Sequence, residues 1–285
     1  MKIGINNLLL GLLITSLNLY SYEDKSYELK ILVYNTHGLP GVFLSDKPDI
    51  RFPEISKKTN LYSIALLQED YAHHEKLISN FDENTLAYRN LPENNGLCLF
   101  CTGSGLTVVS NLPDDWEIEV ENRTFTTCSG WVRGANDCFA YKGFQLIKIT
   151  PTLMDSFFIL NTHMDAGRRD SDRAARREQL IQITSFLKEK VKDRALILAG
   201  DLNLNSKSSK DMELLDMIKE NLNLKDLFSN VEINKKWSIL DYILIRDGKT
   251  ITFNVKSVGE DESFKNKDGP LSDHPALFVE LSVSS

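Results

Sequence analysis

Short apolar segments that recur along the chain constrain its fold more than any other feature. Each is rich in β-branched or aromatic residues and is bounded by turn-forming residues, which predicts a β-strand. Several are apolar on both faces, as strands covered by other layers must be. The predicted strands are residues 30–35, 63–68, 105–110, 144–150, 156–162, 195–200, 239–245 and 276–283.

Helical segments lie between some of these strands. Residues 171–192 place Leu180, Ile183 and Leu187 at helical spacing, and residues 208–221 repeat the pattern. A third helix is predicted over residues 53–66. No internal repeat and no long Pro/Gly/Ser linker divides the chain, so we expect one layered α/β domain.

The first residues differ from the rest. Lys2 is the only charged side chain among residues 1–21, and residues 8–17 are almost wholly apolar. This segment is too short to span a bilayer, and Glu23 and Asp24 follow it. It predicts a cleavable signal peptide over residues 1–21, with a catalytic domain over residues 22–285 and a secreted or periplasmic protein. A buried core helix is the alternative.

The charge balance restricts the partners of the chain. Its 285 residues include 33 Lys and Arg against 40 Asp and Glu, a formal net charge of −7. This charge argues against a protein that relies on bulk attraction to nucleic acid. It suits a site for a divalent cation, because carboxylates are natural ligands of hard cations.

Four cysteines, Cys98, Cys101, Cys128 and Cys138, suggest two disulfides in an exported chain, although four cysteines allow three pairings. Proximity favours Cys128–Cys138, which leaves Cys98–Cys101. Because Cys98 and Cys101 have the spacing of zinc ligands, a zinc site is the alternative.

Polar residues stand repeatedly at the ends of the predicted strands. Taken singly, each is most simply a turn former, a helix cap or a solvated side chain. Strand ends can, however, bring groups from distant sequence positions together, and this series is long. Its members are Asn35, Glu69, His163, Asp201, Asn203, Asp241, Asp273 and His274.

In this order, the pieces Gln68-Glu69, Asn161-Thr162-His163, Gly200-Asp201-Leu202-Asn203 and Ser272-Asp273-His274 resemble the endonuclease/exonuclease/phosphatase superfamily. The resemblance covers nearly the whole chain after residue 30. It implies a four-layer α/β/β/α sandwich of two mixed β-sheets, and a hydrolase that cleaves phosphate esters with a divalent metal.

The resemblance and the chemistry of phosphodiester cleavage together assign a metal site. A hard cation can neutralise the charge that gathers on the phosphate oxygens in the transition state. We expect Glu69 to bind it, with help from Asn35 and Asp273. Since these ligands are oxygen donors, Mg²⁺ is the expected ion, and Mn²⁺ is possible.

Proton transfer is assigned to the other members of the series. His274 is expected to take a proton from the attacking water, because its pKa lies nearest neutrality. The resemblance implies that Asp241 orients this imidazole. We expect Asp201 and Asn203 to position the water and bind phosphate oxygens, and His163 to donate toward the leaving oxygen.

Residues outside these motifs bear on the substrate. The segment from Asp137 to Lys142-Gly143 resembles an Asp-x₄-Lys-Gly segment of sphingomyelinases, which implies that Asp137 and Lys142 contact substrate. A solvated Lys142 at a strand end is the alternative. Arg176 and Gln179 form an Arg-x-x-Gln pattern that those enzymes share, although an ordinary helix also exposes such residues.

Three hypotheses follow for the function. The first is a monomeric sphingomyelinase-type phosphodiesterase that acts on a phospholipid head group with transient membrane contact. The second is a secreted nuclease of the same fold, and the third is an inactive binding or toxin-accessory module.

Residues 246–271 lack the aromatic hairpin with which secreted relatives enter membranes. The cluster Arg168, Arg169 and Arg173 can hold an anionic substrate or simply form a solvated helix start.

Overall fold

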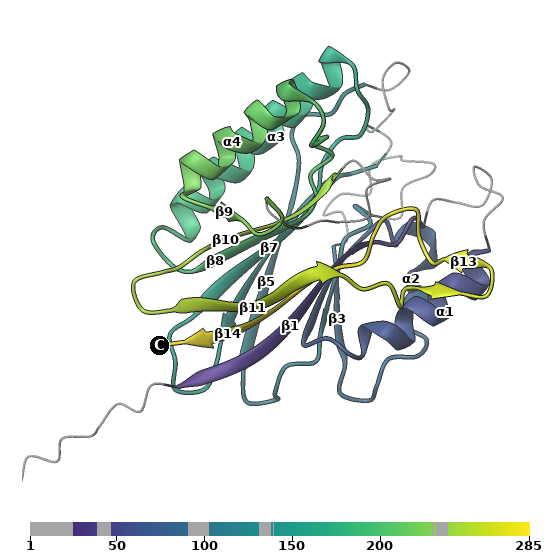
Figure 1. Cartoon of the computed structure of the whole chain (residues 1–285), viewed down its shortest axis with the longest axis vertical. Helices are drawn as coiled ribbons and strands as arrows, with labels where there is room; N and C mark the ends of the chain where they lie inside the picture. The colour runs from purple at the N-terminus through teal and green to yellow at the C-terminus, as the bar shows by residue number, and fades with distance from the viewer. Residues whose placement is uncertain are drawn as a thin grey trace, which may run out of the picture.

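The computed structural model describes residues 25–38, 47–90, 103–130, 138, 140–229, 231 and 239–285. Two six-stranded mixed sheets form its centre (Figure 1). The first sheet has the order β11 (Thr252–Glu260), β14 (Leu277–Ser284), β1 (Ser26–Asn35), β2 (Ile64–Gln68), β4 (Thr107–Ser110) and β3 (Leu86–Arg89). The second has the order β5 (Glu117–Thr124), β6 (Gly143–Thr150), β7 (Phe157–His163), β8 (Leu196–Asp201), β10 (Asp241–Arg246) and β9 (Lys225–Asp226).

Helices cover the outer faces of both sheets. On the first sheet lie α1 (Pro48–Thr59) and α2 (His74–Leu77), which follows a 3₁₀ turn over Tyr71–His73. On the second lie α3 (Asp170–Lys190) and α4 (Ser209–Leu222). A small hairpin pairs β12 (Lys265–Asn266) with β13 (Gly269–Pro270). The expected four-layer α/β/β/α sandwich is confirmed (Figure 1).

Side-chain alternation along the strands builds these layers, since successive residues of a strand point to opposite faces. In β1, Ile31 and Val33 belong to the core between the sheets, whereas Leu32 packs in the core beneath α1. In β7, Ile159 joins the core between the sheets and Leu160 joins the core beneath α3 and α4. Both sheets are therefore covered on two faces, which explains their continuous apolar runs.

The two sheets share one pattern of strand directions. Each has a single parallel pair at its centre, β1 with β2 and β7 with β8, and antiparallel strands on both sides. The carboxyl ends of a parallel pair meet at one edge of the sheet. In register, Asn35 lies opposite Gln68 and His163 lies opposite Asp201. Polar residues of four strands therefore collect at one end of the sandwich.

All eight predicted strands are confirmed, as β1, β2, β4, β6, β7, β8, β10 and β14. The strands that the sequence did not reveal include all four sheet edges, β3, β5, β9 and β11. Because an edge strand is only partly covered, it can carry polar residues on either face and lose the apolar signal. The run Glu-Ile-Glu-Val-Glu-Asn-Arg-Thr of β5 is an example.

The helix predicted over residues 53–66 is wrong at both ends. The observed α1 spans Pro48–Thr59, with Pro48 in its first turn, where a missing N–H costs nothing. Residues 64–68 instead pair with β1 and β4 in the first sheet. The helices predicted over 171–192 and 208–221 are confirmed as α3 and α4.

The predicted Cys128–Cys138 disulfide is confirmed, with a Cα–Cα distance of 5.2 Å. Cys98, Cys101 and the predicted signal peptide over residues 1–21 lie outside the described residues. None of the helices in the described part of the chain is both long and apolar enough to cross a membrane.

Candidate active site

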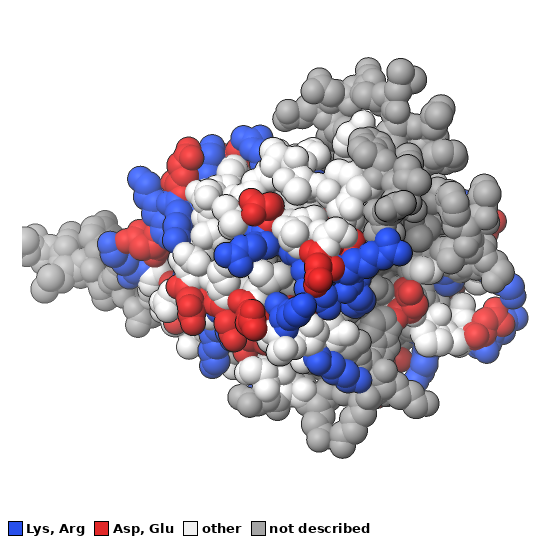
Figure 2. All heavy atoms as spheres, turned by 90° about the horizontal axis from the view of Figure 1, so that it is seen from above, with Lys and Arg blue, Asp and Glu red and all other residues white. Residues whose placement is uncertain are grey.

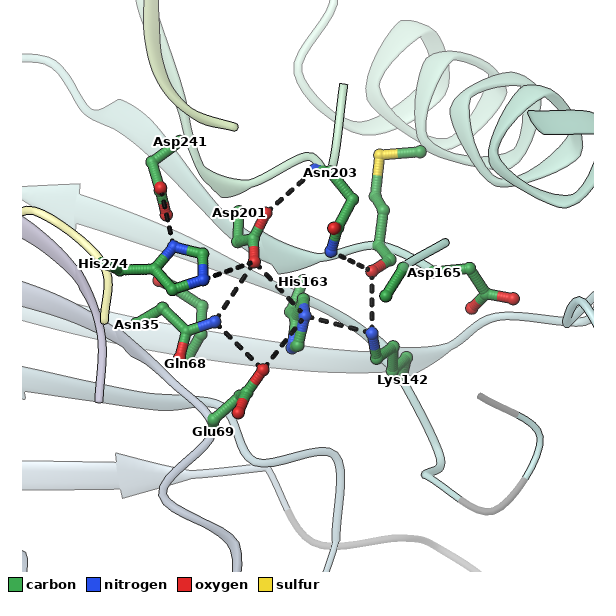
Figure 3. A network of polar contacts seen from close by, with 12 residues as sticks. Asn35, Gln68, Glu69, Lys142, His163, Asp165, Asp201, Asn203, Asp241 and His274 are labelled. Atoms are coloured by element: carbon green, nitrogen blue, oxygen red, sulfur yellow. Dashed lines mark hydrogen bonds and ion pairs between the residues drawn. The ribbon is translucent and has the colours of Figure 1, made fainter. Parts of the chain in front are cut away.

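The polar end of the sandwich gathers most of the predicted site residues (Figure 3). The two parallel pairs contribute their carboxyl ends, β10 contributes its first residue, and the segment before β14 contributes a histidine. The predicted residues that hydrogen bonds and close contacts link together are Asn35, Glu69, Lys142, His163, Asp201, Asn203, Asp241 and His274.

Local backbone geometry explains the Gly-Asp-Leu-Asn motif. Gly200 has φ of 133°, and a Cβ there would lie 2.0 Å from the carbonyl oxygen of Thr162 on the adjacent strand. Only glycine therefore lets β8 pass so close to β7. Glu69 and Asn203 also have positive φ, 57° and 52°, immediately beyond their strands. Strained backbone of this kind is concentrated at functional sites.

Asn35 links the two sheets at the centre of the site. Its Nδ2 donates to Glu69 Oε1 and to Asp201 Oδ2, both at 3.1 Å. Its Oδ1 accepts from the backbone N–H of His37 at 3.0 Å. The amide thus turns its nitrogen toward the carboxylates, whereas the expected role as a metal ligand uses its oxygen. In this structure Asn35 positions the two carboxylates.

The donor set around Glu69 fits a hard divalent cation. One ligand atom each from Glu69, His163 and Asp201 lies within 4.8 Å of the others. The second carboxylate oxygen of Glu69, Oε2, is buried and has no hydrogen-bond partner among the described residues. A buried carboxylate oxygen without a partner is costly, and a cation satisfies it. The same geometric criterion groups Asp201 with Asp241 and His274.

Burial and mutual repulsion keep these carboxyl groups reluctant to ionise. Burial raises the pKa of Glu69, although Lys142 and Asn35 oppose the shift. Burial and the nearby charge of Asp241 raise the pKa of Asp201 to about 6. Both groups therefore favour any partner that supplies positive charge.

His274 and Asp241 form an oriented pair. His274 Nδ1 lies 2.8 Å from Asp241 Oδ2, and its Nε2 points to Asp201 Oδ2 at 3.8 Å (Figure 3). Burial lowers the pKa of His274, but Asp241 and Asp201 outweigh it and raise the pKa to about 10. The hydroxyl of Ser272 accepts from the N–H of His274 and donates to the carbonyl of Asn35, which joins β14 to the site.

Lys142 is buried, and its contacts differ from those of a solvated lysine. Its Nζ lies 3.0 Å from His163 Nε2 and donates to the carbonyl of Met164 at 2.9 Å. Because an ammonium group only donates, His163 Nε2 accepts and its proton sits on Nδ1. Burial and the charges of Lys142 and His274 lower the pKa of His163 well below its ordinary value. His163 is therefore a neutral imidazole beside a fixed positive charge.

Asn203 donates two hydrogen bonds within the site. Its N–H donates to Asp201 Oδ1 at 2.9 Å, and its side-chain Nδ2 donates to the carbonyl of Met164 at 3.0 Å. Lys142 donates to the same carbonyl. Asn203 and Lys142 thus occupy one side of the site, next to His163.

Among the described residues, Asp273 has no hydrogen bond to the other predicted metal ligands, Asn35 and Glu69. Its side chain is 58% exposed and pairs with His37, with 3.0 Å between Oδ1 and Nδ1. Burial alone raises the pKa of Asp273, but the hydrogen bond from His37 reverses the shift and lowers it. His37 is a site residue that the sequence did not reveal. It stands two residues after Asn35, and that position was its only signal.

Buried amides connect the sheets beneath the site. Gln68 Nε2 donates to Asn161 Oδ1 at 2.8 Å, across the gap between β2 and β7. Asn161 Nδ2 in turn donates to Gln145 Oε1 at 3.3 Å. These bonds fix the distance between the two halves of the site, a role that their strand positions alone did not disclose.

Arg176 and Gln179 are fully buried instead of exposed as on an ordinary helix surface. Arg176 Nη1 donates to the carbonyls of Asp165, Ala166 and Gly167, directly after His163. Gln179 Nε2 donates to Asp165 Oδ1 at 2.7 Å. Arg176 and Gln179 therefore anchor residues 165–167, the segment that follows His163. Asp137, the other predicted substrate contact, lies outside the described residues.

No protein-family model matches the chain. Sphingomyelinases of Mycobacterium tuberculosis and Mycobacterium bovis are 26% identical to it over 273 residues, in alignments that cover 89% of this chain and 52% of theirs. The chain thus spans about half the length of the curated relatives it matches.

Solved structures share the fold at low identity. Sphingomyelinase C from Streptomyces griseocarneus has a TM-score of 0.64 at 18% identity, covering 89% of this chain and 99% of that one. An endonuclease/exonuclease/phosphatase from Bacteroides vulgatus has a TM-score of 0.67 at 17% identity, covering 90% and 98%. A beta toxin variant from Staphylococcus aureus with bound magnesium ions has a TM-score of 0.60 at 16% identity, covering 90% and 99%. The chain has the endonuclease/exonuclease/phosphatase fold that its motifs implied.

Proposed function

We propose that the chain is a Mg²⁺-dependent phosphodiesterase of the sphingomyelinase type, which releases phosphocholine from sphingomyelin. The observation that carries the proposal is the convergence of Glu69, Asp201 and the His274–Asp241 pair at one end of the fold. The sphingomyelinase relatives favour this substrate over nucleic acid. All the groups expected for catalysis that lie in the described residues are present, which disfavours an inactive module.

Glu69 and Asp201 are the groups that would hold the metal, whereas Nε2 of the neighbouring His163 is engaged by Lys142. The bound ion would supply positive charge to the phosphate oxygens as the transition state forms. Mg²⁺ suits the carboxylate donors, and Mn²⁺ is the alternative. Asp273 remains a proposed contributor, since its exposed carboxylate lies beside His37 near Asn35.

We assign the attacking side to His274 and Asp241. The carboxylate of Asp241 accepts from Nδ1, so Nε2 of His274 is the nitrogen that faces the attacking water. Although burial lowers the pKa of His274, Asp241 and Asp201 raise it to about 10; a cation held by Asp201 would lower it again and free Nε2 to take the proton. Asp241 also stabilises the imidazolium that forms. Asp201 lies 3.8 Å from Nε2, close enough to orient a water molecule beside it.

We assign the leaving side to Lys142 and His163. The ammonium group of Lys142 can stabilise negative charge on the departing oxygen, and its hydrogen bond holds His163 in one tautomer. Asn203 borders the same space and can donate to a phosphate oxygen if its bond to Met164 exchanges. Asp137 remains proposed as a second substrate contact beside Lys142.

The proposed setting is outside the cytoplasm. A signal peptide over residues 1–21 and the Cys128–Cys138 disulfide suit a secreted or periplasmic protein. We further propose that the protein acts as a monomer on phospholipid head groups.

The test compares two substrates side by side. Purified protein is incubated with sphingomyelin vesicles and with plasmid DNA, in Mg²⁺ and in excess EDTA. We expect Mg²⁺-dependent release of phosphocholine, lost in His274→Ala and kept in the control Lys188→Gln on the distant end of α3. DNA cleavage without phosphocholine release would reject the substrate, and full activity in EDTA would reject the metal.

A further inference from the structure

A group of basic side chains borders the site, and we call it the basic rim. It belongs to the segments that follow β7 and β8 and to the first turns of α3 and α4. Its members are Arg168, Arg169, Arg173, Lys207 and Lys210. Figure 2, which looks onto the side covered by α3 and α4, shows Lys and Arg side chains gathered around one acidic group near the centre of this face.

The rim has more positive charge than its surroundings neutralise. Asp170 is the exposed carboxylate among these residues, and it is shared by Arg173 and Lys210, each at 3.3 Å. Within the described part of the chain, Arg168, Arg169 and Lys207 are exposed and have no ion-pair partner.

The buried carboxylates beneath the rim already accept hydrogen bonds from other groups. Asp172 Oδ2 accepts the N–H of Arg169 at 2.8 Å, and Asp211 Oδ1 accepts from Arg173 and Arg176. One turn further, Glu178 and Glu213 are the nearest exposed acids along the two helices. A surplus of positive charge therefore remains on a chain whose net charge is −7.

Direct hydrogen bonds fix the rim relative to the site. Arg168 Nη1 donates to the carbonyl of Asn203 at 3.1 Å and to that of Gly167 at 3.0 Å. Arg168 thus links the segment that follows His163 at the end of β7 to the segment that follows Asp201 at the end of β8. A surface bound by the rim would lie at a defined position relative to the opening of the site.

The described surface offers little apolar area for membrane contact. Phe253 and Phe264, the aromatic residues of the segment 246–271, are both buried. The β12–β13 hairpin instead exposes Lys265, Lys267 and Asp268. The large apolar side chains exposed in the described residues stand singly on different elements: Ile50, Leu61, Leu86, Leu153, Ile181 and Val255.

We propose that the basic rim docks the site onto an anionic phospholipid surface. The inference rests on the proposed phospholipid substrate and adds the lipid that recruits the protein, as distinct from the lipid that is cleaved. Basic side chains act on an anionic membrane within a Debye length of about 10 Å, so a local patch can bind although the net charge of the protein is negative. Charge attraction would turn the site toward the membrane and keep the acidic remainder of the molecule away.

The test measures binding without turnover. Sedimentation or flotation is performed in EDTA with vesicles of phosphatidylcholine alone, or with added phosphatidylserine, and no sphingomyelin. The test variant is Arg169→Gln/Lys207→Gln, two exposed residues outside the catalytic groups. The control Lys188→Gln/Lys225→Gln makes the same change in net charge, at the far end of α3 and on β9. Turnover of a soluble phosphodiester checks that both variants have an intact site.

We expect wild type to prefer phosphatidylserine vesicles, and the rim variant to bind them about tenfold more weakly, since each basic side chain near an anionic surface contributes severalfold. The control should stay within about twofold of wild type. Equal loss in both variants would show a bulk charge effect, and no loss in either, or no preference for phosphatidylserine, would also overturn the proposal. Binding of duplex DNA is measured in parallel for the same variants. A rim variant that loses DNA binding but keeps vesicle binding would assign the rim to nucleic acid. Because the vesicles contain no sphingomyelin, these outcomes are independent of whether sphingomyelin is cleaved.

Discussion

Two groups of carboxylates with little exposure to solvent differ in how the surrounding side chains satisfy them. The site cluster comprises Glu69, Asp201 and Asp241, and the helix cluster comprises Asp165, Asp172 and Asp211. In the helix cluster, side-chain oxygens accept from Gln179, Ser129, Arg169, Arg173, Arg176 and Asn205. In the site cluster, Glu69 Oε2 and Asp241 Oδ1 have no partner among the described residues.

The difference separates structural carboxylates from functional ones. In the helix cluster, Asp211 pairs with two permanently charged arginines, Arg173 and Arg176. Asp165 and Asp172 accept from an amide side chain and from backbone N–H groups. The site cluster instead faces amides, a lysine and imidazoles, and burial, together with repulsion between its carboxylates, raises the pKa values of Glu69 and Asp201. Unsatisfied oxygens in the site cluster lower the free energy of unfolding of the metal-free protein. A bound cation would raise that free energy again.

The largest expected effect is a loss of catalytic rate when His274 of the site is replaced. Replacing His274 by Ala should lower the rate of phosphodiester hydrolysis by about 10³-fold, because it removes the proposed general base. Its melting temperature should also fall, because the buried carboxylate of Asp241 loses its partner, but the protein should remain folded at the assay temperature. Steady-state kinetics and thermal unfolding on the same preparation check both parts, and a rate within a few fold of wild type would remove His274 from the mechanism.

The second expected effect is a loss of stability when an arginine of the helix cluster is replaced. Arg176→Ala removes the buried donor of three backbone carbonyls and one of the two guanidinium partners of Asp211, so it should lower the free energy of unfolding by about 3–5 kcal/mol. The exposed neighbour Arg177→Ala serves as the control and should change it by about 0.5 kcal/mol or less. Urea unfolding measures both. Similar stability of the two variants would contradict the structural role of the helix cluster.

The third effect concerns pH in metal-free protein. The pKa of Asp201 is raised from 3.8 to about 6 by burial and by Asp241, so the folded state binds its proton more tightly than the unfolded state does. The resulting stability is present below pH 3.8 and is lost as pH rises toward about 6. Asp201→Asn should remove this part of the decline, roughly 1–3 kcal/mol, when unfolding in EDTA is followed from pH 4 to 7. An unchanged pH profile in the variant would count against the raised pKa.

The strands of the sheet interiors could be predicted from the sequence because burial on both faces makes them continuously apolar, as in Phe157–His163. The edge strands could not, since β5 is polar enough to resemble a loop. Sequence order also placed Glu69, His163 and Asp201 at strand ends, and parallel pairing brings such ends together.

Side-chain orientation is what the sequence left undetermined. A strand-end position does not say which atom of Asn35 faces the carboxylates, and the N–H of His37 decides it. Likewise, a helical Arg is usually exposed, and only the segment folded over α3 buries Arg176. Such features depend on contacts between residues far apart in the chain.

The most direct test of the account is the response of stability to Mg²⁺. The free energy of unfolding of wild type should rise by about 2.7 kcal/mol when Mg²⁺ is a hundredfold above its dissociation constant. Glu69→Gln should be at least as stable as wild type in EDTA, because it removes a buried charge, and should show no response to Mg²⁺. A Glu69→Gln protein that Mg²⁺ stabilises as much as wild type would contradict the claim that the site cluster is the metal site.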